Sequence, residues 1–283
     1  MVAVTGDAVS DSLQVVTVEP PSFALSILDD PVTGGGDLTY RFTLTNNDSA
    51  STVDDLEFSN DLNAALSGLV ATGGTGSNIC GSGSSLSGTS FLTFTGGTIA
   101  PSSFCTFDVT VQAPASPADG SYTNTTSDLF SDGLSVASAV SDSFTVDATD
   151  PSLSTVDLIA SSDTGTSDSD DETADSSPTL EFTAESGATV TIDWGNGAGF
   201  VAAGTGTGAA QQETLAAVYT SDNDYTIQVR ATDSAGNTTT QSLTIGIDIT
   251  APDAPSAPDL VAGSDSGRSD SDDITSQTTL SFT

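Results

Sequence analysis

The stretch Asp222-Asn-Asp-Tyr-Thr-Ile-Gln-Val-Arg-Ala-Thr-Asp233 decides the fold class of this chain. Apolar and polar residues alternate in it with a period of two, which is typical of a half-buried β-strand. Tyr225 stands where the strand begins, so it predicts a tyrosine corner, in which the tyrosine caps the bend leading into the strand. The stretch therefore predicts a long strand that is preceded by a sharp bend.

The same alternation recurs along the chain. It predicts strands at 38–44, 104–111, 189–194 and 225–230, separated by turns rich in Gly, Asn, Asp and Ser. After the tight turn at 234–237, a last strand is expected at 238–247. The one helix candidate is the short run 61–66. Strands at this spacing are typical of β-sandwiches, so the predicted fold class is all-β.

The charge of the chain excludes several classes of function. Asp and Glu number 39 against 3 Lys and Arg, His is absent, and the formal net charge is −36. Nucleic-acid binding needs clustered basic side chains, and an anionic membrane surface would repel this chain. All three bases are arginines, so Schiff-base lysines, most acid–base triads and His-ligated zinc are also excluded. No run of 18 apolar residues occurs, so we expect no membrane insertion by this segment. We also expect that the chain is not an enzyme.

Two internal repeats indicate a modular chain. Residues 8–15 recur at 139–146, and the acidic stretch 157–171 recurs at 259–273. We therefore expect four parts, which are the last strand of a preceding module at 1–19, whole modules at 20–147 and 148–248, and a linker with the first strands of a next module at 249–283. Because the final residues 279–283 form a strand pattern without a following turn, we expect a segment of a longer chain.

The two cysteines, Cys80 and Cys105, lie in the first whole module. An even number of cysteines in a strand-rich chain without lysine suggests an oxidising, extracytoplasmic location. A bridge between them would close a loop of about 25 residues, which stabilises by roughly 3 kcal/mol in the chain-entropy model. Two buried free thiols are the alternative.

The first module resembles a known family. The resemblance is carried by Leu38-Thr-Tyr-Arg-Phe-Thr-Leu-Thr-Asn46, Cys80-Gly-Ser-Gly, Leu92-Thr-Phe-Thr-Gly-Gly-Thr-Ile-Ala-Pro101, Cys105-Thr-Phe-Asp-Val109 and Tyr122-Thr-Asn124. These motifs are similar to the conserved repeat domains of large bacterial surface proteins. The resemblance implies an Ig-like sandwich with a Cys80–Cys105 bridge and without catalytic activity.

The second module resembles the bacterial Ig-like repeats of giant adhesins. The matching segments are the strand and turn at 187–197, the stretch 222–233, the turn Ser234-Ala-Gly-Asn237 and the linker Asp248-Ile-Thr-Ala-Pro252. Together the two resemblances imply tandem Ig-like β-sandwich modules. Trp194 is expected to be a core residue, with stacking on a ligand as the alternative.

Carboxylates gather in the two repeated loops, at Asp163, Asp168, Asp170 and Asp171 and again at Asp265, Asp270, Asp272 and Asp273. So many carboxylates repel one another unless a cation lies between them, and Ca²⁺ takes roughly six to eight oxygen ligands in flexible geometry. The resemblance to calcium-binding Ig-like repeats adds the linker Asp248 and the turn Asp233 as ligands. The predicted cofactor is therefore Ca²⁺, and the alternative is a solvated acidic loop of a high-salt surface protein.

These observations predict a stalk or fibre segment of a large bacterial adhesin or matrix protein at the cell surface or outside the cell. We expect its partners to be neighbouring modules of the same chain or other copies of itself, and calcium at module junctions to stiffen the array. The alternative is a filament subunit, in which residues 8–18 would be a donor strand that completes the sheet of a neighbouring copy.

Overall fold

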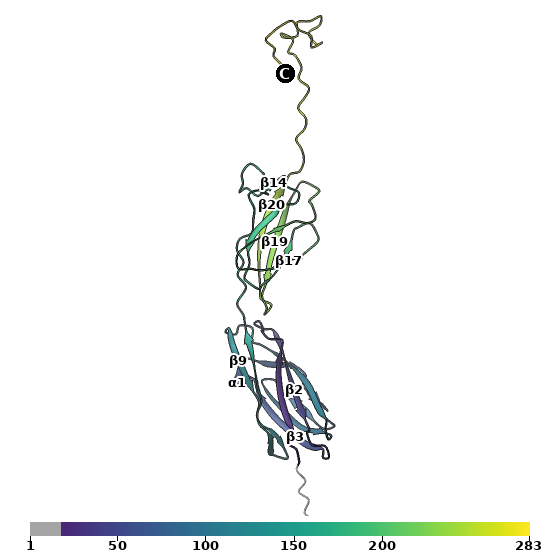
Figure 1. Cartoon of the computed structure of the whole chain (residues 1–283), viewed down its shortest axis with the longest axis vertical. Coiled ribbons are helices and arrows are strands. Elements are labelled where there is room, and N and C mark those ends of the chain that lie inside the picture. Colours follow the sequence, from purple (N-terminus) through teal and green to yellow (C-terminus); the bar gives the residue numbers. More distant parts are fainter. Residues whose placement is uncertain (1–17) are drawn as a thin grey trace, which may run out of the picture. The chain divides into compact units, whose positions relative to one another are not determined.

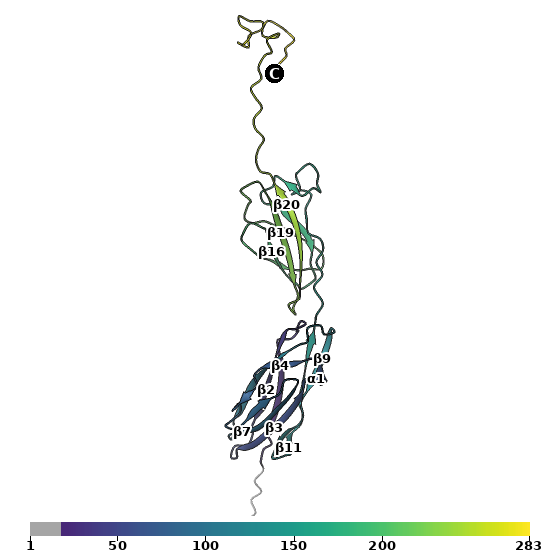
Figure 2. The same cartoon turned by 180° about the vertical axis from the view of Figure 1, so that it is seen from behind.

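The computed structural model describes residues 18–283, so the repeat copy at 8–15 lies outside the described residues. The described strands fall into two sets, and no described sheet joins strands of both sets. Figures 1 and 2 show the strands of each module from two sides. The predicted all-β class with tandem Ig-like sandwiches is confirmed.

One layer of the first module is a four-stranded sheet with the order β1-β2-β8-β4. Its strands are β1 (Ser22–Leu28), β2 (Asp37–Thr45), β8 (Phe104–Gln112) and β4 (Val70–Gly73). All the described ladders of this sheet are antiparallel, and β2 pairs with β8 along its full length from Asp37 to Thr45. The alternation at 38–44 and 104–111 thus predicted the two central strands, because both bury one face only.

The second layer of the first module is a six-stranded sheet with the order β11-β10-β3-β7-β6-β5. Its strands are β11 (Leu134–Ala137), β10 (Leu129–Ser131), β3 (Val53–Asp61), β7 (Phe91–Ile99), β6 (Ser85–Ser87) and β5 (Gly76–Ser77). The short helix α1 (Leu62–Ala65) follows β3, which confirms the helix candidate at 61–66. The remaining strands, β9 (Gly120–Thr125) and β12 (Ser141–Val146), pair with each other.

Phenylalanine rings fill the space between the two layers. The Phe58 ring on β3 lies 4.7 Å from the Phe23 ring, 5.1 Å from the Phe42 ring and 5.3 Å from the Phe94 ring, measured between centroids. These four side chains come from both sheets and are all buried. Because aromatic rings bury the largest apolar areas of any side chain, this cluster supplies much of the core of the module.

The second module has a three-stranded sheet, β13-β15-β18, and a five-stranded sheet, β14-β20-β19-β16-β17. The strands are β13 (Asp157–Leu158), β14 (Glu172–Thr173), β15 (Thr179–Thr183), β16 (Thr189–Asp193), β17 (Val201–Thr205), β18 (Ala210–Thr214), β19 (Asn223–Thr232) and β20 (Thr238–Ile247). Strand β20 has the predicted bounds. Trp194 is buried, which confirms its place in the core.

In both modules an early segment pairs in parallel with the last strand. Val32, after β1, forms a parallel bridge with Val146 of β12, and β14 pairs in parallel with β20. Beyond β20, the opening strands predicted within 249–283 are reduced to one bridge between Leu260 and Phe282. A strand is stabilised by the neighbouring strands of its sheet, and residues 249–283 offer few partners of this kind.

Candidate functional site

The first acidic loop connects β13 to β14 and contains one buried carboxylate. The Asp163 side chain is 4% exposed, and its Oδ2 accepts a hydrogen bond from the Asp171 amide at 3.4 Å. Its Oδ1 is buried without a hydrogen-bond partner among the described residues. Burial raises the pKa of the Asp163 carboxyl, and the negative charge of Asp170 adds to the rise.

The buried serine next to Asp163 holds the loop against the strand that follows it. The Ser162 hydroxyl donates to Asp175 Oδ2 at 3.0 Å and accepts from the Thr179 amide at 3.0 Å. The Asp163 amide in turn donates to the Ile159 carbonyl at 3.0 Å. The loop therefore fixes the position of the Asp163 carboxylate through its own backbone.

The second acidic loop repeats this arrangement. Asp265 is 4% exposed, and its Oδ2 accepts from the amides of Asp272 and Asp273 at 2.9 and 3.2 Å. Its Oδ1 is likewise buried without a hydrogen-bond partner in the described part of the chain. Ser264 occupies the place of Ser162 and accepts from the Ser281 amide at 3.1 Å. The two acidic loops therefore have the same local structure.

The other carboxylates predicted in these loops lie at the surface or at its edge. Asp168, Asp170, Asp270, Asp272 and Asp273 are exposed, and Asp171 is partly exposed. Several accept hydrogen bonds from backbone amides: Asp170 accepts from the Ser167 amide at 3.0 Å, and Asp273 accepts from the Leu260 amide at 3.2 Å. Each loop therefore offers one buried carboxylate among several solvated ones.

The two ligands predicted outside the loops lie at opposite ends of β20. Asp248 follows β20 directly, and its amide donates to the Thr173 carbonyl at 2.9 Å, next to the first acidic loop. Asp233 precedes β20, whose ten residues span about 34 Å at 3.4 Å per residue. The structure therefore brings Asp248, but not Asp233, to the end of the module that carries the Asp163 loop.

Asp233 has a structural role in its own turn. Its Oδ1 accepts from the amides of Ala235, Gly236 and Asn237 at 2.9, 2.7 and 2.9 Å, and its Oδ2 accepts from the Asn237 side chain at 2.8 Å. No three His, Cys, Asp or Glu side chains within residues 18–283 are grouped closely enough to hold a metal ion. The acidic loops thus form no closed cage of carboxylates.

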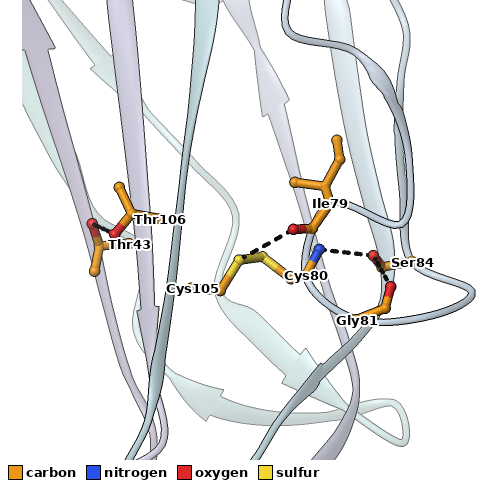
Figure 3. Close-up of a disulfide and its surroundings, with 7 residues drawn as sticks. All are labelled: Thr43, Ile79, Cys80, Gly81, Ser84, Cys105 and Thr106. Carbon is orange, nitrogen blue, oxygen red and sulfur yellow. Dashed lines mark hydrogen bonds between the residues drawn. A yellow bond between two sulfur atoms is a disulfide. The ribbon is translucent and has the colours of Figure 1, made fainter.

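The two cysteines form a disulfide that links the two layers of the first module (Figure 3). Cys80 lies in the loop between β5 and β6, Cys105 lies on β8, and their Cα atoms are 5.7 Å apart. Ser84 braces the loop, because its hydroxyl accepts from the Cys80 amide at 2.9 Å and donates to the Gly81 carbonyl at 2.9 Å. The bridge implied by the family resemblance is confirmed.

Two family models match the chain. Residues 21–146 match a domain of unknown function (DUF7933), and residues 150–249 match the bacterial Ig-like domain. The second module is a bacterial Ig-like domain. The predicted resemblance to bacterial Ig-like repeats is thereby confirmed, and the bacterial Ig-like domain includes the first acidic loop, Asp233 and Asp248.

Solved structures that resemble the chain do so at low identity. A family 123 glycoside hydrolase from Clostridium perfringens matches 46% of this chain at 14% identity and a TM-score of 0.30, and the chain spans 28% of its length. The major pilin subunit of Bacillus cereus matches 81% of this chain and 67% of its own at 12% identity and a TM-score of 0.34. The C-terminal domain of an AgI/II polypeptide of Streptococcus agalactiae matches 80% of this chain and all of its own at 11% identity and a TM-score of 0.39.

None of the curated proteins compared with the chain matches it. Among residues 18–283, no helix has the length and the apolar character needed to cross a membrane.

The sequence pattern did not predict a further pair of carboxylates. Asp119 in the first module and Asp222 in the bacterial Ig-like domain each accept two hydrogen bonds from the segment that leaves their module. The signal was present, since each lies three residues before a tyrosine, Tyr122 or Tyr225. The strand pattern predicts a corner only at the second of these tyrosines.

Proposed function

We propose that this chain is a non-catalytic structural segment, a stalk or fibre, of a large bacterial extracellular adhesin or matrix protein. The observation that carries this proposal is repetition, because the loops around Asp163 and Asp265 have the same buried carboxylate and the same serine brace. A chain that repeats one unit along its length extends in space, whereas an enzyme builds one concave site from many elements.

Charge and oxidation state support a place at the cell surface or outside the cell. The net charge of −36 favours solubility and mutual repulsion between chains, and the cysteines are paired, as expected in an oxidising compartment. The partners proposed on this basis are neighbouring modules of the same chain or other copies of it.

Calcium at the acidic loops is the second part of the proposal. The buried Oδ1 atoms of Asp163 and Asp265 support it, since an unpaired buried carboxylate oxygen is costly and a hard cation is its natural partner. Asp168, Asp170 and Asp171 would join Asp163, and Asp270, Asp272 and Asp273 would join Asp265. When bound, the ion supplies the positive charge that these loops lack.

Asp248 extends this proposal to the linker. It follows the strand that pairs with β14, beside the first acidic loop, so an ion there would hold the linker as well as the loop. Asp233 is not part of this site, because it lies at the other end of β20. Calcium would stiffen the array by joining the loop of one module to the linker that leaves it.

Calorimetric titration of the full chain tests calcium binding. After treatment with a chelator, we expect Ca²⁺ to release or absorb heat at two sites and Mg²⁺ to bind more weakly, because Mg²⁺ demands octahedral geometry and gives up its water reluctantly. The variants Asp163→Asn and Asp265→Asn should each remove one site. The matched control Asp224→Asn, an exposed carboxylate of the second module, should remove neither.

Stability provides a second readout of the same sites. At a calcium concentration of about 100 times the Kd, binding stabilises the second module by about 2.7 kcal/mol. Trp194, the single tryptophan, reports unfolding of this module alone by its fluorescence. Absence of heat together with an unchanged unfolding transition would rule out calcium at the Asp163 loop.

Small-angle X-ray scattering tests the stiffening. With calcium, we expect a larger radius of gyration and a narrower distribution of dimensions than in excess chelator, because a bound ion restricts bending at the linker. Equal scattering curves in both conditions would refute the stiffening while leaving the structural role intact.

Strand exchange between copies is the alternative assembly. Residues 8–17 of the proposed donor strand 8–18 lie outside the described residues. The repeat copy of residues 8–15, at 139–146, contains β12. Strand β12 already pairs with β9 of its own module, which favours a covalent array. Sedimentation of the full chain distinguishes the two, since a filament subunit would form oligomers that deletion of residues 1–17 abolishes.

A further inference from the structure

The segment that leaves each module begins with the same three residues at the same spacing. Both segments read Asp-x-Thr-x-Pro, with Asp147, Thr149 and Pro151 after β12 and Asp248, Thr250 and Pro252 after β20. The aspartate follows the last strand directly, and the proline prevents the chain from continuing as a regular strand pair. The threonine between them is exposed in both segments, so burial does not explain its presence.

In the second module this threonine is bound to the loop before β19. The Thr250 hydroxyl donates to Oδ2 of Asp222, and the Ile249 amide donates to Oδ1 of the same carboxylate at 2.8 Å. The loop is itself closed by the corner tyrosine, because the Tyr225 hydroxyl donates to the Ser221 carbonyl at 3.3 Å. One carboxylate on a braced loop therefore binds two consecutive residues of the linker.

The first module has the same arrangement with different neighbours. The Thr149 hydroxyl donates to Oδ2 of Asp119, and the Ala148 amide donates to Oδ1 at 2.7 Å. The Tyr122 hydroxyl donates to the Ala118 carbonyl at 2.8 Å, so this module also has a tyrosine corner directly after its acceptor. In both modules, Oδ2 of the aspartate accepts from the threonine hydroxyl, and Oδ1 accepts from the amide of the residue before the threonine.

The linker backbone makes further hydrogen bonds in both modules. The amides of Thr149 and Thr250 donate to Oδ1 of Asp147 and Asp248, each at 3.2 Å. The Asp147 amide donates to the Val32 carbonyl at 3.0 Å, as the Asp248 amide does to Thr173. Each linker is thus tied to its parent module through three consecutive residues.

The repetition of this arrangement in two unlike modules argues that it is not incidental. The modules match different family models, and the hydrogen-bonded pairs are 30 and 28 residues apart in sequence, yet the same donors meet the same acceptors. The hydrogen bonds from Thr149 and Ala148 hold the pKa of Asp119 below its usual value, and those from Thr250 and Ile249 do the same for Asp222. Both carboxylates are therefore ionised at neutral pH, and hydrogen bonds to an ionised acceptor are stronger than neutral ones.

We propose that Asp119 with Thr149, and Asp222 with Thr250, are equivalent exit clamps that fix the direction in which the linker leaves each module without a metal ion. Bending in such a chain is confined to the residues beyond each clamped threonine. The clamp is independent of calcium, so it would hold the exit even where the acidic loop is empty.

The clamp is tested by the local order of the linker, measured by NMR on the full chain in excess chelator. Because both carboxylates are exposed, each hydrogen bond adds little to the global stability, and order at residues 249 and 250 is the sensitive readout. In the unmodified chain we expect heteronuclear NOE values at Ile249 and Thr250 equal to those of β20. We also expect the Ile249 amide shift to follow the titration of Asp222.

Matched variants separate the clamp from general effects. Asp222→Ala and Thr250→Val should lower the NOE values at residues 249 and 250 and raise amide exchange there several-fold. Thr250→Ser, which keeps the hydroxyl, and Asp224→Ala, at an exposed position of β19, should leave both quantities unchanged. Asp222→Ala should also abolish the titration of the Ile249 amide shift.

Two results would overturn the proposal. Linker order that survives both Asp222→Ala and Thr250→Val would show that the hydrogen bonds do not hold the exit. Linker order that is absent in chelator and restored by calcium would show that a metal ion holds it instead. Should a second-module variant fail to fold, Asp119→Ala and Thr149→Val give the same readout at Ala148 and Thr149 in the first module.

Discussion

The side-chain amides of Asn60 and Asn124 hydrogen-bond each other twice. Asn60 Nδ2 donates to Asn124 Oδ1 at 2.7 Å, and Asn124 Nδ2 donates to Asn60 Oδ1 at 2.9 Å. Both side chains are buried, and they join β3 of the six-stranded sheet to β9 of the two-stranded sheet. A buried amide pair that satisfies itself in this way fixes one register between two sheets.

Removal of one partner should be costly. Asn124→Ala leaves the buried Asn60 amide without its partner, so we expect the first module to lose about 2 kcal/mol of unfolding free energy. Urea unfolding followed by resolved amide resonances of β2 measures this, and the Trp194 fluorescence transition should stay in place. Thr125→Ala, at the exposed neighbouring position of β9, is the control, and an equal loss in the control would contradict the prediction.

The disulfide should stabilise the first module alone. The double variant Cys80→Ser with Cys105→Ser opens a loop closed across 25 positions, and the chain-entropy model gives a loss of about 3 kcal/mol. We expect the unfolding midpoint of the first module to fall and that of the second module, reported by Trp194, to remain. A reducing agent should reproduce the effect in the unmodified chain, and equal midpoints with and without the bridge would refute it.

The strands were predictable because their signal is local. Strand β20 has the predicted bounds, and β2 contains the alternating run 38–44. A half-buried strand shows its period of two in consecutive residues, so the pattern is visible in the sequence. The strands β5, β13 and β14 escaped prediction because each has only two residues, too few for a period to be visible.

The candidate site was only partly predictable because burial is set by distant residues. The sequence placed Asp163 in an acidic cluster, but it could not tell that Asp163 alone would be buried while Asp168 and Asp170 stay exposed. Asp233 was grouped with them, although the length of β20 separates it from the loop. The pairing of Asn60 with Asn124 has no local signal either, because it depends on how two sheets meet.

The Asp48 carboxylate predicts a loss of stability in acid for the first module. Its Oδ1 accepts from the amides of Ala50 and Ser51 at 2.7 and 2.8 Å, and these bonds hold the pKa of Asp48 below its usual value of 3.8. A carboxyl whose pKa is lower in the folded state contributes stability that is complete above the unfolded value and is lost as the pH falls through the folded value.

This pH dependence can be isolated with one substitution. Asp48→Asn keeps an oxygen that can accept from the turn but cannot ionise, so the first module should lose less stability between neutral pH and pH values below 3.8. Urea unfolding at both ends of this range, followed by the amide resonances of β2, measures the slope of the unfolding free energy of the first module against pH. Asp54→Asn, at an exposed position of β3, should keep the full slope, and a slope unchanged in Asp48→Asn would contradict the prediction.

The tyrosine corner of the second module should contribute through its ring more than through its hydroxyl. The Tyr225 ring stacks on the Tyr219 ring with centroids 4.0 Å apart, and Tyr219 is buried. Tyr225→Phe keeps this stack and removes the hydrogen bond to the Ser221 carbonyl, so we expect a loss of about 1 kcal/mol.

Tyr225→Ala removes the stack as well and should cost about 3 kcal/mol. Urea unfolding followed by Trp194 fluorescence measures both variants in the same module. Tyr122→Phe supplies a matched variant in the first module and should leave the Trp194 transition where it is. If Tyr225→Phe and Tyr225→Ala cost the same, the hydroxyl and not the stacked ring would hold the corner.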